Sequence, residues 1–326
     1  MQRVERPTNK TVFKVHSITQ AILGVLIFVF PHSCGVFFLE GNTHNGIESE
    51  TGHLIIRMYG LLSCANAWIL AVASHRATTL TKNTLIYGYA FCYVFSFLEI
   101  CHRHARRDGS MYFGFFGIIF ALFYASFATV YCWICFTSED EDTESEPSSN
   151  PVFTRYDGGL KLDGLFLFAA SGYGLCGISG LFFPKVYKLV FNTGNFGMGL
   201  ENGAAICVVR LYSCLLCAMA WFVLVIARTP GQKNRLAFVQ ALSLYSLLSV
   251  VTIIQKNQDE SGSVFGTIAC LVWGIGHVAF GGMFAYYWKR IYEVQASADS
   301  ETLREAESIR ASAGDGGAAT ENSPLV

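Results

Sequence analysis

Eight long apolar runs, separated by polar segments, constrain the fold of this 326-residue chain more than any other feature. A helix needs about 20 mostly apolar residues to cross the hydrocarbon core of a membrane. The runs have about that length, and they are continuous rather than alternating, which favours helices over barrel strands. They cover residues 17–38, 54–75, 84–101, 112–135, 164–183, 204–227, 236–254 and 264–288. We therefore predict an all-α, multi-pass integral membrane protein with eight transmembrane helices.

Composition supports this class and excludes others. Hydrophobic residues make up 52% of the chain and charged residues 14%, whereas soluble domains carry roughly 25% charged residues. The net charge of -1 leaves no large basic field for a nucleic acid. The sequence also lacks a glycine-rich phosphate loop, a zinc-protease helix and a Ser/His/Asp order. We expect no enzymatic activity, no cofactor and no nucleic-acid partner, and we expect the lipid bilayer and other proteins as partners.

The two halves of the chain share residues at one constant offset, which indicates an internal duplication. Positions 153 apart match as follows: Phe30-Pro31 with Phe183-Pro184, Arg57 with Arg210, Tyr59 with Tyr212, Cys64-Ala65 with Cys217-Ala218, and Trp68 with Trp221. We predict two parallel four-helix repeats, residues 1–136 and 164–292, each forming its own bundle. Because each repeat has an even number of spans, the two share one orientation about an axis along the membrane normal.

Polar segments connect and follow the repeats. Residues 137–163 are acidic and contain Ser and Pro, which predicts a flexible linker. Residues 293–326 form a polar tail that we expect to prolong the last helix as far as the glycines at 314–317. With the N-terminus in the cytosol, fifteen Lys and Arg fall on the inner side and six on the outer side. Both termini are therefore predicted to be cytosolic.

The end of the chain carries a sorting pattern. Glu321 is followed by Leu325 and Val326, as in an acidic-dileucine signal. This pattern predicts an endolysosomal or plasma-membrane location.

The repeated residues resemble a known family. Phe-Pro, followed at the next span by Arg-Leu/Met-Tyr, is similar to the p53-inducible protein eleven family of small four-span membrane proteins. In the second half Phe183, Pro184, Tyr187, Phe191, Arg210, Leu211 and Tyr212 carry the resemblance, and in the first half Phe30, Pro31, Phe38, Arg57, Tyr59 and Gly60 do so. Cys34 stands where the pattern has Tyr. The resemblance implies a tandem fusion with a link to growth restraint, and it implies no reaction or ligand.

Two arginines within spans are the first candidate site, because ionisable residues in a membrane are costly and often functional. Arg, Cys and Trp at i, i+7 and i+11 share one helix face. The predicted site for an anionic lipid or metabolite consists of Arg57, Tyr59, Trp68, Arg210, Tyr212 and Trp221. The alternatives are that each arginine extends to the membrane surface or that it pairs, with Glu99 as a partner for Arg57.

Further candidates are histidines and cysteines near the span ends. Weak metal candidates are His32, His53, His102 and His104, whose alternatives are pH sensing or simple solvation. Cys132 and Cys135 close the fourth span and are candidates for palmitoylation.

Two functions follow from these features. The first is a non-enzymatic organiser or regulator that acts through partners, for which we expect almost no polar residues deep in the spans. The alternative is a carrier or lipid-binding protein with an anion site near Arg57 and Arg210, between the repeats.

Overall fold

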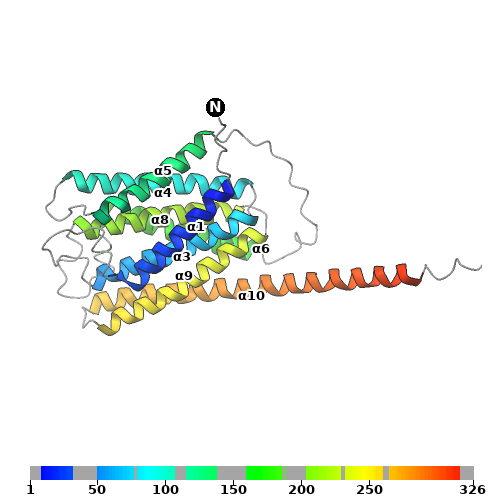
Figure 1. The fold of residues 1–326 in the computed structure, drawn as a ribbon. Helices are drawn as coiled ribbons and strands as arrows, with labels where there is room; N and C mark the ends of the chain where they lie inside the picture. Colours follow the sequence, from blue (N-terminus) through cyan, green and yellow to red (C-terminus); the bar gives the residue numbers. More distant parts are fainter. Residues whose placement is uncertain are drawn as a thin grey trace, which may run out of the picture.

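A computed structural model describes residues 9–31, 50–76, 79–106, 115–137, 159–185, 187, 203–228, 232–259 and 264–315. Within these ranges the chain forms eight helices and no strand, which confirms the all-α class. The helices are α1 (Asn9–Val29), α3 (Glu50–Arg76), α4 (Thr79–Arg106), α5 (Phe115–Thr137), α6 (Gly159–Phe182), α8 (Gly203–Arg228), α9 (Gln232–Asp259) and α10 (Val264–Asp315). Most of them run side by side along one direction (Figure 1).

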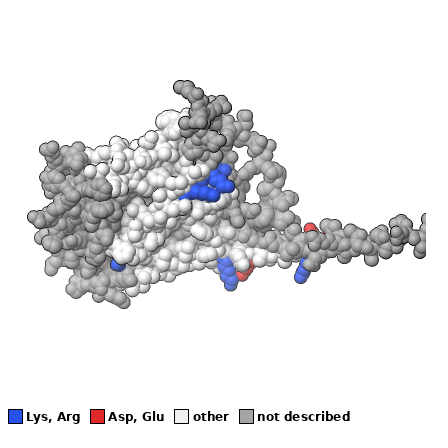
Figure 2. Space-filling view, viewed as in Figure 1, with Lys and Arg blue, Asp and Glu red and all other residues white. Residues whose placement is uncertain are grey.

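Seven of the described helices contain a stretch that is long and apolar enough to cross a membrane: α1, α3, α4, α5, α6, α8 and α9. Their outward-facing residues are large and apolar, and they include Ile18, Phe95, Leu122, Leu175 and Val251, each about half exposed or more. On the face drawn in Figure 2, the middle of the bundle is free of described charged side chains. An integral membrane protein is the setting in which such a surface is stable.

The first helix begins and ends earlier than the sequence predicted. The apolar run suggested residues 17–38, whereas α1 covers Asn9–Val29. Proline disfavours helical geometry in the residue before it, so Pro31 ends the helix near Phe30. At the other end, Val12 and Phe13 are buried while the neighbouring Lys10 and Lys14 are exposed. The polar start of α1 is therefore helical because one of its faces packs in the bundle.

The helices of the two halves interleave instead of forming two separate bundles. Within each half the first two helices pack together, α1 on α3 and α6 on α8, and so do the last two, α4 on α5 and α9 on α10. Between the halves, α4 packs on α8 and α3 packs on α9, with α3 and α8 in contact at the centre. The expectation of two self-contained bundles is thus wrong, because the second helix of each half packs on the third helix of the other half.

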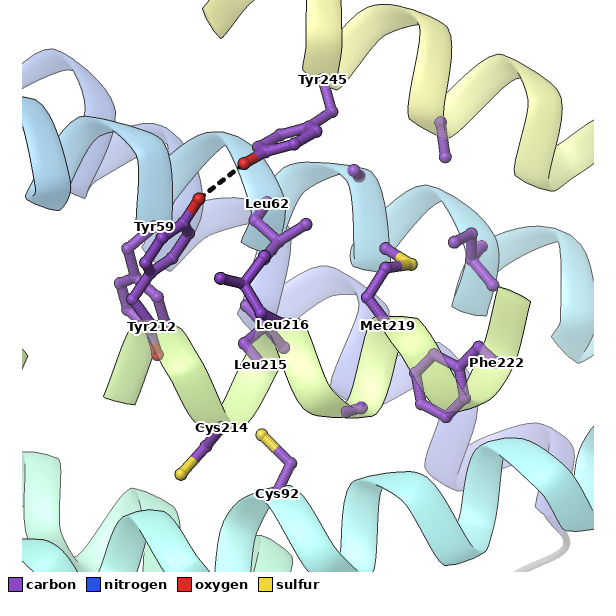
Figure 3. Packing of buried hydrophobic residues seen from close by; sticks show 14 of the residues in the cluster. Tyr59, Leu62, Cys92, Tyr212, Cys214, Leu215, Leu216, Met219, Phe222 and Tyr245 are labelled. Atoms are coloured by element: carbon purple, nitrogen blue, oxygen red, sulfur yellow. Dashed lines mark hydrogen bonds between the residues drawn. The ribbon is translucent and has the colours of Figure 1, made fainter. Parts of the chain in front are cut away.

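The centre of this arrangement is densely packed. Leu62 of α3 and Leu216 of α8 lie beside each other, with Met219 and Phe222 further along α8 (Figure 3). All four side chains are at most 2% exposed. A methyl group on Gly88 of α4 would lie 2.2 Å from the ring of Phe222, so a larger residue here would force that buried ring to move.

Two crossings inside the halves depend on glycine in the same way. A methyl group on Gly24 would lie 2.8 Å from Cys64 Sγ and 2.8 Å from the carbonyl oxygen of Gly60. A methyl group on Gly177 would lie 2.6 Å from Cys217 Sγ. Small residues let helix backbones approach closely, which is a common way to hold helices together in a membrane.

Interleaving predicts that the halves bind each other without the linker. When residues 1–150 and 151–326 are produced as separate chains in one cell, we expect them to copurify in equal amounts, because α4–α8 and α3–α9 contacts join them. Gly88→Leu should reduce this copurification severalfold, whereas Gly172→Leu should not, since nothing lies within 4 Å of a Cβ at Gly172. Pull-down with quantitative mass spectrometry measures the ratio. Halves that purify alone would contradict the interleaved fold.

The last helix is much longer than a membrane span. α10 has 52 residues and continues well beyond the other helices (Figure 1). At about 1.5 Å per residue, the part from Lys289 to Asp315 extends roughly 40 Å. The expected prolongation of the last span into the polar tail is confirmed to Asp315. That α10 also crosses the membrane remains a prediction.

Candidate functional site

Arg210 lies in a polar contact between the two halves. Its Nη1 donates a hydrogen bond of 2.7 Å to Glu99 Oε2 on α4, and its Nε donates one of 3.1 Å to the carbonyl oxygen of Leu181 near the end of α6. The Glu99 side chain is only 11% exposed and that of Arg210 is 24% exposed. The guanidinium is therefore neutralised by a carboxylate and also satisfies a carbonyl at a helix end. An anion at Arg210 would have to displace Glu99.

Glu99 was one alternative partner for Arg57, and its described ion pair is with Arg210. The reason is the interleaving, because α4 packs on α8 of the other half and not on α3. On the equivalent contact between α9 and α3, Thr252 lies 3.6 Å from the sulfur of Met58, the neighbour of Arg57. Arg57 itself is partly buried.

The other residues of the predicted anion site are divided between the core and the surface. Tyr59 and Tyr212 are buried and hydrogen-bond to other tyrosines, Tyr59 to Tyr124 and Tyr212 to Tyr245 at 2.7 Å (Figure 3). Trp68 and Trp221 lie outside the core, 46% and 45% exposed. Trp68 Nε1 donates to Gln240 Oε1 of α9 at 3.1 Å. The helix face that carries Arg210, Cys217 and Trp221 thus runs from a contact between the two halves to the outer surface.

Of the remaining candidates, only some fall on described residues. His102 is exposed at the end of α4, and Cys132 and Cys135 are partly buried near the end of α5. Palmitoylation of these cysteines stays a prediction. Among the described residues no group of three or more His, Cys, Asp or Glu could hold a metal ion. The following lie outside the described residues or have side chains outside them: His32, His53, His104, Glu321, Leu325 and Val326.

One fully enclosed ionisable side chain was not singled out from the sequence. His16 of α1 is 0% exposed. Its Nδ1 lies 2.5 Å from Tyr131 Oη of α5, and its Nε2 lies 2.5 Å from Tyr93 Oη of α4. The rings of Tyr89 and Phe127 lie 4.7 Å and 4.6 Å from the imidazole and complete an aromatic enclosure.

His16 was missed because it stands before the expected start of the first span, in a stretch assigned to the cytosol. A signal was nonetheless present in the spacing. Phe13, His16, Ser17 and Gln20 repeat at the period of one helix face, and all four are buried. A neutral imidazole has one donor and one acceptor, so it can bond both hydroxyls at once.

Other polar groups are also enclosed, contrary to the expectation of an almost apolar interior. Tyr89 Oη donates to Asn66 Oδ1 at 2.9 Å, and Asn66 Nδ2 donates to the carbonyl oxygen of Leu62 at 2.8 Å. Ser17 Oγ donates to the carbonyl oxygen of Ala67 at 2.8 Å. In lipid an unsatisfied polar group is costly, so these groups bond one another across helices.

Comparison with known proteins gives no assignment for this arrangement. No protein-family model matches the chain, and neither a curated protein nor a solved structure matches it.

Proposed function

We propose that this is a non-enzymatic membrane protein that organises or regulates partner proteins through α10. The observation that carries the proposal is the length of that helix, which continues roughly 35 Å from Tyr292 to Asp315, beyond its last described buried residue, Ile291. From Tyr292 on, the described side chains, which include Tyr292, Glu293, Arg304 and Glu305, are exposed. A solvated helix of this length contributes nothing to the membrane core, and it offers a continuous surface to another protein.

The proposal includes an orientation, with both termini and the projecting part of α10 in the cytosol. The charge distribution supports it, because fifteen Lys and Arg lie on the proposed inner side and six on the outer side. The location would be endolysosomal or plasma membrane.

We also propose that the halves are copies of one four-span unit that resembles the p53-inducible protein eleven family. Gly24 and Gly177 support this, since they are 153 positions apart and each approaches a cysteine, Cys64 or Cys217, that is also 153 positions from the other. The matched pattern of helix contacts, α4 on α8 and α9 on α3, supports it too. A role in growth restraint would follow from that resemblance.

Proximity labelling in cells tests the organiser proposal. A biotin ligase joined to the N-terminus of the full chain should label a reproducible set of cytosolic proteins. A stop codon after Glu293 removes the projecting helix and leaves the bundle, and we expect labelling of that set to fall at least fivefold. The comparison requires equal amounts of both proteins in the same membrane.

A second truncation, after Gly317, serves as the control because it keeps all of α10 and removes the terminal sorting pattern. It should retain the labelled set. The proposal is overturned if loss of α10 beyond Glu293 leaves the set unchanged, or if both truncations remove it equally.

A further inference from the structure

We propose that the first half of the bundle contains a proton-transfer path formed by Tyr131, His16, Tyr93, Gln20, Tyr124 and Tyr59. The inference is independent of the organiser role. It rests on a series of enclosed hydroxyl, imidazole and amide groups that follow one another along the bundle, and the transported species is a proton.

The inner part of the path is a continuous pair of hydrogen bonds. His16 joins Tyr131 on one side and Tyr93 on the other, with both oxygen-to-nitrogen distances at 2.5 Å. All three side chains are at most 4% exposed. The groups that face the imidazole from α4 and α5 are the phenols of Tyr89, Tyr93 and Tyr131 and the ring of Phe127, all of them uncharged.

The outer part is the hydrogen bond between Tyr59 of α3 and Tyr124 of α5. Both residues are buried, at 9% and 2% exposure. The ring of Tyr124 lies 5.4 Å from that of Tyr93. A single gap, between Tyr93 and Tyr124, therefore separates the inner part from the outer part.

Along α1, Gln20 lies at the depth of the gap between Tyr93 and Tyr124. It is one helical turn from His16, which hydrogen-bonds to Tyr93. In the other direction it is one turn from Gly24, which approaches Gly60, the neighbour of Tyr59. The side chain is 5% exposed, and its Oε1 has no hydrogen-bond partner among the described residues. An amide oxygen enclosed without a partner in a membrane protein is costly. We assign it a water molecule, which would join Tyr93 to Tyr124.

A proton can move through these groups without any change of oxidation state. A proton that arrives at Tyr131 Oη is accepted there as that hydroxyl passes its own proton to His16 Nδ1. The imidazolium then releases its other proton from Nε2 to Tyr93 Oη, which passes its proton to the water. Tyr124 and Tyr59 relay it onward, and each group ends with the number of protons with which it began. Rotation of the hydroxyls and exchange of the imidazole tautomer restore the starting state.

The second half provides an internal contrast. The positions 153 beyond His16, Tyr93 and Tyr131 are Ala169, Ser246 and Phe284. The second half does contain a buried tyrosine pair, Tyr212 and Tyr245. The ring of His277 lies 5.6 Å from that of Tyr245, but no hydrogen bond between a histidine and this pair occurs among the described residues.

Proton flux into liposomes tests the path. The full-length protein is reconstituted in phosphatidylcholine vesicles that contain a pH-sensitive dye, and potassium with valinomycin sets an inside-negative potential. We expect acidification at least tenfold faster than in protein-free vesicles. His16→Leu and Tyr93→Phe should each return the rate to that of protein-free vesicles, and Gln20→Leu should reduce it at least fivefold.

Tyr245→Phe is the matched control, and it should keep the full rate. Tyr93→Phe retains the ring, so unfolding does not explain its effect if its melting temperature equals that of Tyr245→Phe. The path is overturned if the wild-type rate equals that of protein-free vesicles, if His16→Leu and Tyr93→Phe leave it unchanged, or if Tyr245→Phe abolishes it equally.

Discussion

Replacing Glu99 by Gln is expected to lower the free energy of unfolding by about 3 kcal/mol, because the charge of Arg210 is left without its carboxylate in a largely enclosed position. For a protein of this size that loss corresponds to a melting temperature lower by roughly 6–12 °C. Thermal unfolding in detergent, followed by tryptophan fluorescence, measures the shift. Replacement of both partners, Glu99→Gln with Arg210→Met, should cost less than the single change.

Glu293→Gln is the matched control for this cycle. Glu293 lies 3.9 Å from both Lys289 and Arg290, and its side chain is 49% exposed on the projecting part of α10. Exposed pairs are worth about 0–1 kcal/mol, so the melting temperature should hardly change. Equal shifts in Glu99→Gln and Glu293→Gln would show that the Glu99–Arg210 pair contributes no more to stability than an exposed pair.

The combined change Gly24→Ala with Gly177→Ala is expected to destabilise the protein by about 2–6 kcal/mol. Each new methyl would lie within 3.0 Å of backbone atoms of the facing helix, which cannot move aside as a side chain can. Overpacking costs about 1–3 kcal/mol a site, and separate sites add. The melting temperature in detergent, together with the fraction that elutes as a single species, provides the measurement.

The control for the glycines uses the same substitution in the same kind of helix. At Gly172 of α6 and Gly276 of α10, nothing lies within 4 Å of the position that a Cβ would take. Since alanine favours helices more than glycine does, Gly172→Ala with Gly276→Ala should be neutral or slightly stabilising. Destabilisation by both pairs alike would mean that close approach is not the cause.

The helices were predictable from the sequence because a membrane admits few structures and requires long apolar runs. The residues at which the helices begin and end were less predictable. α1 ends at Val29, nine residues before the apolar run does, because the hydropathy pattern continues past Pro31 whereas helical geometry does not. The polar tail was correctly expected to continue as a helix to about Gly314.

The pairing of side chains was not predictable, because it depends on which helices are neighbours. Glu99 and Arg210 are 111 positions apart, and no pattern within either helix relates them. A repeat in the sequence suggests two equal bundles, but it does not distinguish helices that pack within a half from helices that exchange across halves. His16 was overlooked for a related reason, since its enclosure comes from Tyr93 and Tyr131 on distant helices.

The exchange of contacts between α3, α4, α8 and α9 also determines how the protein is made. A ribosome completes α3 and α4 long before it begins α8, so the surfaces that will contact α9 and α8 face the lipid until those helices are made. During that interval the Glu99 carboxylate lacks Arg210, and the surface around Gly88 lacks Phe222. We therefore expect the nascent first half to need membrane chaperones until α8 and α9 are made. A premature stop anywhere before α9 should send the whole product to degradation, however intact its first four helices are.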